Sequence, residues 1–594
     1  MKKSWIRAAL SLLLVLALLA APASALTAEQ TRQLLEEYYV DPVDESILSL
    51  PTTQQMLDAL GDPYTQYLTA EEYQGFMDSM SDETLVGIGI SISAQLTAED
   101  PFTVDEVFEN GPAAKGGLEP GDVIVAVDHM DVQGMEPDDI VAMIRGREGS
   151  QVSITYLRGG SRRAVTLTRE TVYIPATTGK LLPGGVCYIQ CTTWGEETLG
   201  HFHQIMGQYA KETQCWLIDL RNNPGGLTDA ATHVAGLFCG PGNMLSLRAR
   251  TQDEESPDGY AYEFYPSRSV PATTKPVVIL VNEYSASSSE AFASALRDYR
   301  AAVIVGSRTY GKGVAQGILD EKNYPDYFDG DCLKLTIARF YSPGGNTNHT
   351  LGVIPDFWVE DPVAAENLAL NLAGAFAQDP ENWLMTRNEV ADLFVVDTQF
   401  EDALDATAEN RAINTLRAYG LVSGKDDGLF HASDTLTRAE LAQMLVNALR
   451  CWTQSDGTAF EDVDAQAWYA DAVTAIAAQG MMEGTGEDRF SPEQVLTRQE
   501  LFTVLGRLGC WLNDDLDLAV RQATPADWDL PALSGYAQWA RPSVWLLSCS
   551  LDDPDSPTNL LWDDPNAIDP NAPATRGEAA QVLYFLLYYL SILN

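Results

Sequence analysis

A cluster of serines in the middle of the chain could supply a nucleophile. The stretch VNEYSASSSEAFASALRDY covers residues 281–299, and four of the five residues from 285 to 289 are serine. A strand is expected to end near Val281, and apolar residues from Phe292 to Tyr299 recur at helical spacing. The serines are therefore expected at a strand–turn–helix junction, where N–H groups and the helix dipole favour developing negative charge. A flexible joint, the other interpretation of a serine cluster, would not lie between a buried strand and an amphipathic helix.

A serine hydroxyl needs a general base to act as a nucleophile. None of the histidines, at positions 129, 201, 203, 233, 349 and 431, lies in a segment of this kind. Lysine is the other option, and AVIVGSRTYGKGVAQ places Lys312 between two glycines after an expected strand. Partial burial would lower the pKa of this side chain and give a neutral amine. Serine–lysine pairs are a known variant of the catalytic triad.

A glycine pair follows another expected strand. CWLIDLRNNPGGL runs from an apolar strand into a loop that ends at Gly225 and Gly226. Two adjacent glycines allow the backbone to present N–H groups at close range to a ligand. Taken alone, the pair is equally consistent with a tight turn.

Four segments in order carry a family resemblance. LIDLRNNPGG, VNEYSASSSE, RTYGKG and YSPGGNTNHTLGVIPD resemble the motifs of the C-terminal processing (tail-specific) peptidases, family S41, and the resemblance covers roughly residues 30–375. It implies a multidomain α/β protein with a ClpP/crotonase-like peptidase core and an inserted, mainly β PDZ domain. VGIGISI and ENGPAAKGGLEPGDVIVAVD are similar to that PDZ domain.

The resemblance also implies roles for individual residues. The family nucleophile is the second serine of a SASASE-like motif, 25 residues before the lysine, which gives Ser287 as nucleophile and Lys312 as general base. Gln316, one helical turn further on, is expected to orient the lysine.

The implied oxyanion hole uses backbone N–H groups. They belong to Ser288 and to the Gly225–Gly226 loop. Ser288 replaces the alanine of the family motif, which leaves its N–H unchanged. Glu290 and Asp298 are expected to be structural.

The PDZ resemblance implies a way of choosing substrates. PDZ domains add a peptide as an extra strand at a sheet edge and hold its terminal carboxylate with loop amides. Here the carboxylate loop would be Val86, Gly87, Ile88 and Gly89. Exposed C-terminal tails of proteins are the implied partners, and a PDZ domain that only packs is the alternative.

The C-terminal part is helical and repetitive. TLTRAELAQML, VLTRQELFTVL and ATRGEAAQVL share a T-R-x-E core. The segment AFEDVDAQAWYADAVTAIAAQGMMEGTGEDRFSPEQVLTRQEL resembles an S-layer homology domain; the first repeat lacks the usual opening, and the third carries a long insertion. The resemblance implies that Arg438, Arg498 and Arg576 bind cell-wall polysaccharide through its acidic groups. The alternative is an inter-helix salt bridge of each arginine with the following glutamate.

These boundaries give an expected domain division. The expected parts are a signal peptide (1–25), an N-terminal helical region (26–83), a PDZ domain (84–170), a peptidase core (171–375) and a linker (376–394). An all-α region of three S-layer homology repeats follows, at 395–452, 453–512 and, in divergent form, 513–594.

Composition limits the class of protein. The net charge of −47 disfavours nucleic-acid binding. Lys2, Lys3 and Arg7 precede the uncharged run AALSLLLVLALLA, and APASAL offers cleavage after Ala25, so export is expected and no membrane span remains afterwards. An uncleaved anchor is the alternative. The eight scattered cysteines are expected to be mostly buried thiols, and no cysteine–histidine cluster has zinc-ligand spacing.

Together these features predict an exported serine endopeptidase, tethered to a Gram-positive-type cell wall, that cleaves proteins near their C-termini without metal or other cofactor. The competing hypotheses are a catalytically silent wall-bound PDZ scaffold that binds C-termini, and a glycan-binding structural protein. The oligomeric state is left open.

Overall fold

The computed structural model describes most of the chain in two compact units, residues 77–178 and the remainder. The described residues are 26–80, 84–92, 101–108, 111–135, 137–173, 175–251, 256, 259–268, 270–396, 398–451, 460–486, 488–548 and 568–593. The expected signal peptide therefore lies outside them. Within these ranges, no helix combines the length and the apolar character needed to cross a membrane.

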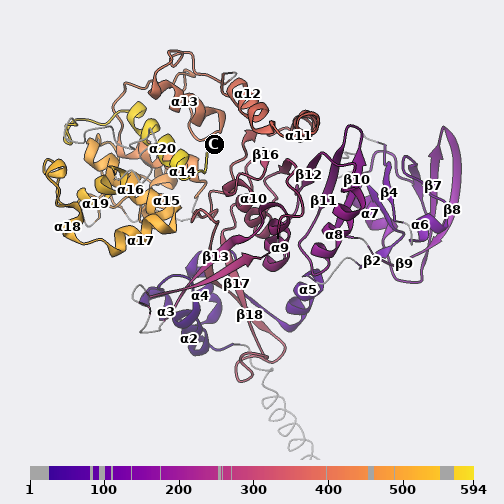
Figure 1. Ribbon diagram of the computed structural model, residues 1–594. Coiled ribbons are helices and arrows are strands. Elements are labelled where there is room, and N and C mark those ends of the chain that lie inside the picture. The colour runs from indigo at the N-terminus through magenta and orange to yellow at the C-terminus, as the bar shows by residue number, and fades with distance from the viewer. Residues whose placement is uncertain are drawn as a thin grey trace, which may run out of the picture. The chain divides into compact units, whose positions relative to one another are not determined.

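The unit of residues 77–178 is mainly β (Figure 1). Its strands pair as β2 (Thr84–Gly87) with β9 (Glu170–Tyr173), β3 (Ile90–Ile92) with β4 (Val104–Val107), and β6 (Met130–Asp131), β5 (Val123–Val127), β7 (Gln151–Arg158) and β8 (Ser161–Thr168) in that order. The helices are α6 (Pro112–Lys115) and α7 (Pro137–Ile144). Alternate residues of the strands, such as Ile124, Val152 and Ile154, fill one apolar core with Ile140 of α7.

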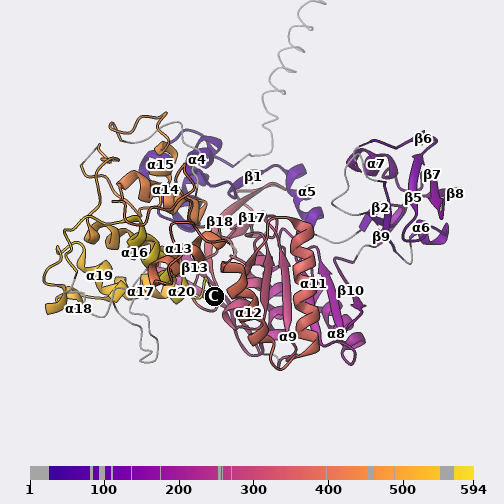
Figure 2. The same ribbon diagram turned by 90° about the horizontal axis from the view of Figure 1, so that it is seen from above.

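A largely parallel sheet forms the centre of the larger unit. Its strand order is β10 (Thr177–Leu182), β11 (Val186–Cys191), β12 (Cys215–Asp219), β15 (Val277–Val281), β16 (Val303–Gly306) and β19 (Phe357–Trp358). One face packs on α8 (Thr198–Tyr209), α9 (Thr228–Cys239) and α10 (Ser288–Asp298), and the other on α11 (Pro362–Gln378) and α12 (Trp383–Val396) (Figure 2). Burial on both faces explains the unbroken apolar runs CWLID and VVILV.

A second sheet joins the N-terminal helices to the centre. It contains β1 (Gln66–Leu68), β18 (Cys332–Tyr341), β13 (Gly242–Arg250) and β14 (Tyr260–Ser267), and β17 (Val314–Asp320) also pairs with β18. The helices α2 (Ala28–Tyr38), α3 (Glu45–Leu48) and α4 (Thr53–Leu60) cover this sheet, and α5 (Ala70–Met80) follows β1 (Figure 1). Residues 26–80 are thus mostly helical, but residues 66–68 form a strand because they pair with β18.

The C-terminal part is helical in its described residues and closes on itself. The helices are α13 (Ala408–Ala418), α14 (Arg438–Leu449), α15 (Ala470–Ala478), α16 (Arg498–Leu512), α17 (Asp514–Gln522), α18 (Pro525–Trp528), the 3-10 turn η1 (Pro531–Leu533), α19 (Arg541–Ser548) and α20 (Arg576–Tyr589). The T-R-x-E segments meet in a ring: Leu496 N–H donates to Leu436 O, Ala574 N–H to Leu496 O, and Leu436 N–H to Ala574 O. Each repeat therefore bonds to both others.

The C-terminal helices dock on the loop of residues 342–348, here called the YSPGG loop. Thr347 N–H donates to Leu512 O, and Asp514 N–H donates to Gly345 O. Asn513 Nδ2 donates to Gly344 O and to Asn346 Oδ1, both at 2.9 Å.

Candidate active site

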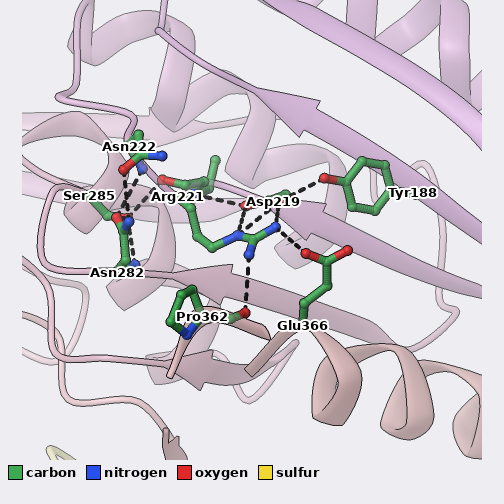
Figure 3. A network of polar contacts seen from close by, with 9 residues as sticks. Tyr188, Asp219, Arg221, Asn222, Asn282, Ser285, Pro362 and Glu366 are labelled. Atoms are coloured by element: carbon green, nitrogen blue, oxygen red, sulfur yellow. Dashed lines mark hydrogen bonds and ion pairs between the residues drawn. The ribbon is translucent and has the colours of Figure 1, made fainter. Parts of the chain in front are cut away.

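The two loops expected to carry chemistry meet at the carboxyl edge of the parallel sheet. Strands β12 and β15 are parallel neighbours, so the glycine loop after Asp219 and the serine loop after Val281 leave the sheet side by side. Asp219 is buried at the end of β12, where it accepts from Tyr188 Oη at 2.7 Å and pairs with Arg221, which also pairs with Glu366 (Figure 3). This network fixes the start of the glycine loop.

Side-chain hydrogen bonds tie the two loops together. Asn222 N–H donates to Asn282 Oδ1, and Asn282 Nδ2 donates back to Asn222 Oδ1, each at 2.9 Å (Figure 3). Ala286 N–H donates to Asn223 O at 3.0 Å. The glycine loop and the serine loop therefore form one rigid assembly.

The four serines of the cluster differ in their hydrogen bonds. Three hydroxyls donate to carbonyls of the glycine loop: Ser285 to Leu220 at 2.7 Å, Ser288 to Gly226 at 2.8 Å and Ser289 to Asn223 at 3.1 Å. Among the described residues, the Ser287 hydroxyl makes no hydrogen bond to the glycine loop. Its side chain instead faces the backbone N–H of Glu290 in the first turn of α10. Ser287 is thus the serine whose hydroxyl is not used to build the loops.

Ser287 occupies a strained backbone conformation. Its φ is 56° and its ψ is −115°, a region that residues other than glycine rarely adopt. Such conformations persist only where the surroundings impose them, and they cluster at functional sites. Here the turn presents a side chain that is 9% exposed at the N-terminus of α10.

The buried carboxylate of Glu290 joins the serine turn to the lysine loop. It is 0% exposed and accepts four hydrogen bonds: Oε2 from Ser287 N–H at 2.8 Å and Lys312 N–H at 2.9 Å, Oε1 from Gly311 N–H at 2.7 Å and Thr309 Oγ1 at 2.6 Å. Burial raises the pKa of Glu290 and these donors oppose that rise. Since all four partners are donors, the ionised form satisfies them. One oxygen atom thus links the backbones of Ser287 and Lys312.

Lys312 lies in the loop before β17 and is half-buried. Burial lowers the pKa of its amine, and Lys334 lowers it further, while Glu290 and Asp62 act in the opposite direction. A lowered pKa increases the fraction of neutral amine that can accept a proton at a given pH.

The glycine loop approaches Ser287 closely. A Cβ on Gly225, whose φ is +111°, would lie 2.8 Å from Ser287 Cβ, so only glycine fits. The Gly225 N–H donates to Asn223 Oδ1 at 2.9 Å and is already engaged. Within the described residues, the N–H groups of Gly226 and Ser288 make no hydrogen bond.

Gln316 lies on a strand rather than one helical turn after Lys312. It belongs to β17 and its Nε2 donates to Thr336 Oγ1 of β18 at 3.3 Å. The expectation of a helical turn is wrong because pairing with β18 holds Val314–Asp320 extended, with a register shift between Ala315 and Gln316.

Several residues of the site were not singled out from the sequence. Asn223 shapes the glycine loop, Thr309 bonds Glu290 and accepts from Val353 N–H at 2.6 Å, and Tyr64 lies against Lys312. His349 packs on Gly313, and burial lowers its pKa to about 4. Asn223, Thr309 and His349 lie within the segments that carry the family resemblance, whereas Tyr64 lies outside them.

Comparison with known proteins agrees with these features. Residues 185–359 match the model of peptidase family S41, residues 103–158 that of the PDZ domain, and residues 399–442 and 459–502 that of the S-layer homology domain. Residues 185–359 are therefore similar to the peptidase domain of family S41.

Some of the curated proteins that the chain resembles come from staphylococci. A probable CtpA-like serine protease of Staphylococcus epidermidis is 31% identical over 337 residues, 56% of this chain and 65% of that protein. Its counterpart in Staphylococcus aureus is 32% identical over 335 residues, 56% of this chain and 64% of that protein. The chain thus spans somewhat less than two thirds of these relatives. Among solved structures, the photosystem II D1 C-terminal processing protease is 27% identical, with 59% of this chain and 97% of that chain covered and a TM-score of 0.36.

The predicted carboxylate loop of the PDZ domain lies between two strands. Val86 and Gly87 end β2, and Ile88 and Gly89 lead into β3. The N–H groups of Ile88 and Gly89 make no backbone hydrogen bond in the described part of the domain, and Gly89 has a φ of +78°. Among the described strands, β3 pairs with β4 alone and leaves its other edge unpaired.

The three repeat arginines are not equivalent. Arg438 Nε donates to Phe490 O at 2.7 Å and Arg576 Nε to Phe430 O at 3.0 Å, and each guanidinium lies over the ring of the same phenylalanine. Arg498 instead pairs with Glu578 at 2.6 Å. The inter-helix salt bridge expected as the alternative thus forms at Arg498, although its partner is the motif glutamate of the next repeat.

A cavity of about 650 Å³ is lined by residues of all three repeats. Its lining includes Arg576, Lys425, Glu440 and Trp468, whose side chain is 62% exposed. The cations can bind acidic substituents of a sugar, the carboxylate can accept from sugar hydroxyls, and the exposed indole offers an apolar face.

Proposed function

We propose that the protein is an exported serine endopeptidase that cleaves protein substrates near their C-termini with a Ser287–Lys312 dyad. The observation that carries this is a pair of hydrogen bonds at Glu290. Its Oε2 accepts from the backbone N–H groups of both Ser287 and Lys312. The S41 domain and the relatives named as serine proteases support the same reaction.

The proposed reaction passes through an acyl-enzyme. Ser287 Oγ attacks the scissile carbonyl while Lys312 Nζ takes its proton. The tetrahedral oxyanion is stabilised by the N–H groups of Ser288 and Gly226, with Gly225 providing the close approach. Lys312 returns the proton to the leaving amine, and water then hydrolyses the ester. Gln316, proposed to position the lysine, would act from β17.

The proposed substrates are proteins with exposed C-terminal tails. The unpaired edge of β3 and the Val86–Gly87–Ile88–Gly89 loop would receive the tail as an added strand and bind its carboxylate. The repeats would attach the enzyme to wall polysaccharide, with the Arg576 cavity as the strongest candidate. Arg438 and Arg498 remain proposed contacts.

We also retain the expected domain division as a proposal. The central sheet covered by helices on both faces supports a ClpP/crotonase-like core at residues 171–375. The described helices from 408 onward support an all-α repeat region at 395–594.

Alanine substitution tests the dyad. The mature chain should cut an unstructured tail peptide, and Ser287→Ala and Lys312→Ala should each reduce the rate by a factor of about 10⁴ or more without changing the melting temperature. Ser285→Ala removes a hydroxyl that bonds the glycine loop, and it should lower the rate far less than Ser287→Ala. Equal cleavage by the wild type and Ser287→Ala would rule out this nucleophile, and absence of cleavage by the wild type would favour the PDZ scaffold.

A further inference from the structure

An aromatic ring from the N-terminal segment lies beside the Lys312 amine. Tyr64 follows α4 in the turn before β1, and Lys312 Nζ lies 5.3 Å from the centre of its ring. A cation within about 6 Å of a tyrosine ring centre is attracted by the negative charge of the ring face. Tyr64 is therefore placed to favour the ammonium form of the lysine.

The turn that carries Tyr64 is fixed to the strand that supports the lysine loop. Asp62 accepts from Tyr64 N–H at 2.9 Å and from Thr65 Oγ1 at 2.6 Å. Thr65 Oγ1 in turn accepts from Thr336 N–H of β18 at 3.0 Å. Since β17 starts two residues after Lys312 and also pairs with β18, ring and amine are held by the same strand.

The other groups around Lys312 do not replace this contact. Lys334 of β18 repels the ammonium, while Glu290 of α10 and Asp62 attract it. Glu290 uses its oxygens for the four donors already described, and His349 has a pKa lowered to about 4 and is neutral near pH 7. Burial and the neighbouring Tyr310 raise the pKa of Tyr64, which keeps its ring neutral.

We propose that Tyr64 is a positioning residue of the peptidase site, whose ring face holds the Lys312 side chain and stabilises the ammonium formed when Ser287 gives up its proton. This proposal rests on the proposed function, because the ammonium forms during that reaction. It assigns the N-terminal helical region a part in catalysis: this region supplies one wall of the base site.

Two substitutions separate the ring from the hydroxyl. Tyr64→Phe retains the ring face and should leave the rate unchanged. Tyr64→Leu removes it and should lower kcat by about 3- to 30-fold. The acid limb of kcat/KM should move to lower pH by roughly 0.4 to 1.5 units, because the ammonium loses a favourable contact. Tyr67→Leu, which removes a ring of the same segment bonded to Asp331, is the matched control and should not move the limb.

Three results would overturn the proposal. They are equal losses in Tyr64→Phe and Tyr64→Leu, a loss in Tyr64→Leu with an unmoved acid limb, and wild-type behaviour of both variants. Circular dichroism and the melting temperature identify a variant that fails to fold; in that case Tyr64→Met, which keeps an apolar side chain of similar length without a ring face, takes the place of Tyr64→Leu.

A second measurement does not require proteolysis. The rate at which an amine-reactive reagent labels Lys312, followed by mass spectrometry as a function of pH, gives the pKa of the amine in the full chain. Its midpoint should fall in Tyr64→Leu and stay in Tyr64→Phe. An unchanged midpoint contradicts the Tyr64 contact, whereas a shifted midpoint without any Ser287-dependent cleavage would contradict only the proposed function.

Discussion

Lys312 is surrounded by groups that shift its pKa in opposite directions. Burial and Lys334 lower the pKa of the amine, and Glu290 and Asp62 raise it, with a net lowering. The proposed base must be neutral to accept a proton. Cleavage should therefore rise as pH increases through the pKa of Lys312 and be lost below it, with the acid limb at lower pH than the value of about 10.4 for a free lysine.

Removal of the positive charge of Lys334 should move the acid limb of cleavage to higher pH. Lys334→Gln takes away a repulsion, so the pKa of Lys312 should rise and the acid limb should move to higher pH by roughly half a unit to one unit. The measurement is the pH dependence of kcat/KM. Lys322→Gln makes the same charge change at an exposed position and should leave the limb in place. A shift in both variants would indicate a change of overall charge instead.

Gly225 should tolerate no side chain. In Gly225→Ala the new Cβ would lie 2.8 Å from Ser287 Cβ on a backbone with φ of +111°. Displacement of the serine turn should lower kcat by about 100-fold or more. Gly207→Ala on α8 adds a methyl with nothing within 4 Å and is the matched control. Full activity of Gly225→Ala would show that the loop moves away without effect.

The sequence singled out the two proposed catalytic residues, Ser287 and Lys312, but not most of the residues that surround them. The choice of Ser287 among the serines came from the family pattern, and the hydrogen bonds of Ser285, Ser288 and Ser289 give a physical reason for it. Tyr64 lies more than 200 residues from the dyad in the chain and is brought to Lys312 by the bond of Thr65 to Thr336 of β18. Contacts of that kind have no local signal in a single sequence.

Helix α10 and the lysine loop are held together by one side chain. In Glu290→Gln an amide NH₂ would face N–H donors, so the free energy of unfolding should fall by roughly 2 to 4 kcal/mol and activity should fall with it. Thermal unfolding and peptide cleavage measure the two effects. Thr309→Val removes one donor to the same carboxylate and should cost less. Equal stability of Glu290→Gln and wild type would contradict this role.

The sequence predicted the elements that are marked by continuous apolar runs. It did not predict those whose conformation depends on pairing with a distant strand. The runs CWLID and VVILV became buried parallel strands. The spacing of Lys312 and Gln316 suits a helical turn, yet β17 is extended because it pairs along β18. The C-terminal repeats were visible as a pattern, whereas the ring that joins their T-R-x-E segments is a tertiary property.

For the whole molecule, wall attachment should depend on the Arg576 cavity. Trp468→Ala should weaken co-sedimentation with purified cell walls by roughly tenfold. Trp539, 56% exposed, lines a different cavity with no repeat arginine among its lining residues, and Trp539→Ala should bind like the wild type. Arg576→Ala is a poorer test, because the guanidinium also donates to the backbone carbonyls of Phe430 and Ser423 and so joins the third repeat to the first. Equal binding by all variants would exclude this cavity as the glycan site.

The YSPGG loop connects the repeats to the helix that presents Ser287. On one side it bonds the segment Leu512–Asp514 of the repeats; on the other, Asn348 Nδ2 donates to Ser294 Oγ of α10 at 3.2 Å. Ser342 Oγ and Gly344 N–H donate to Asp298 at the end of the same helix. If the repeats bind a cell wall as proposed, a force on the peptidase would act through this loop on the helix whose first turn presents Ser287.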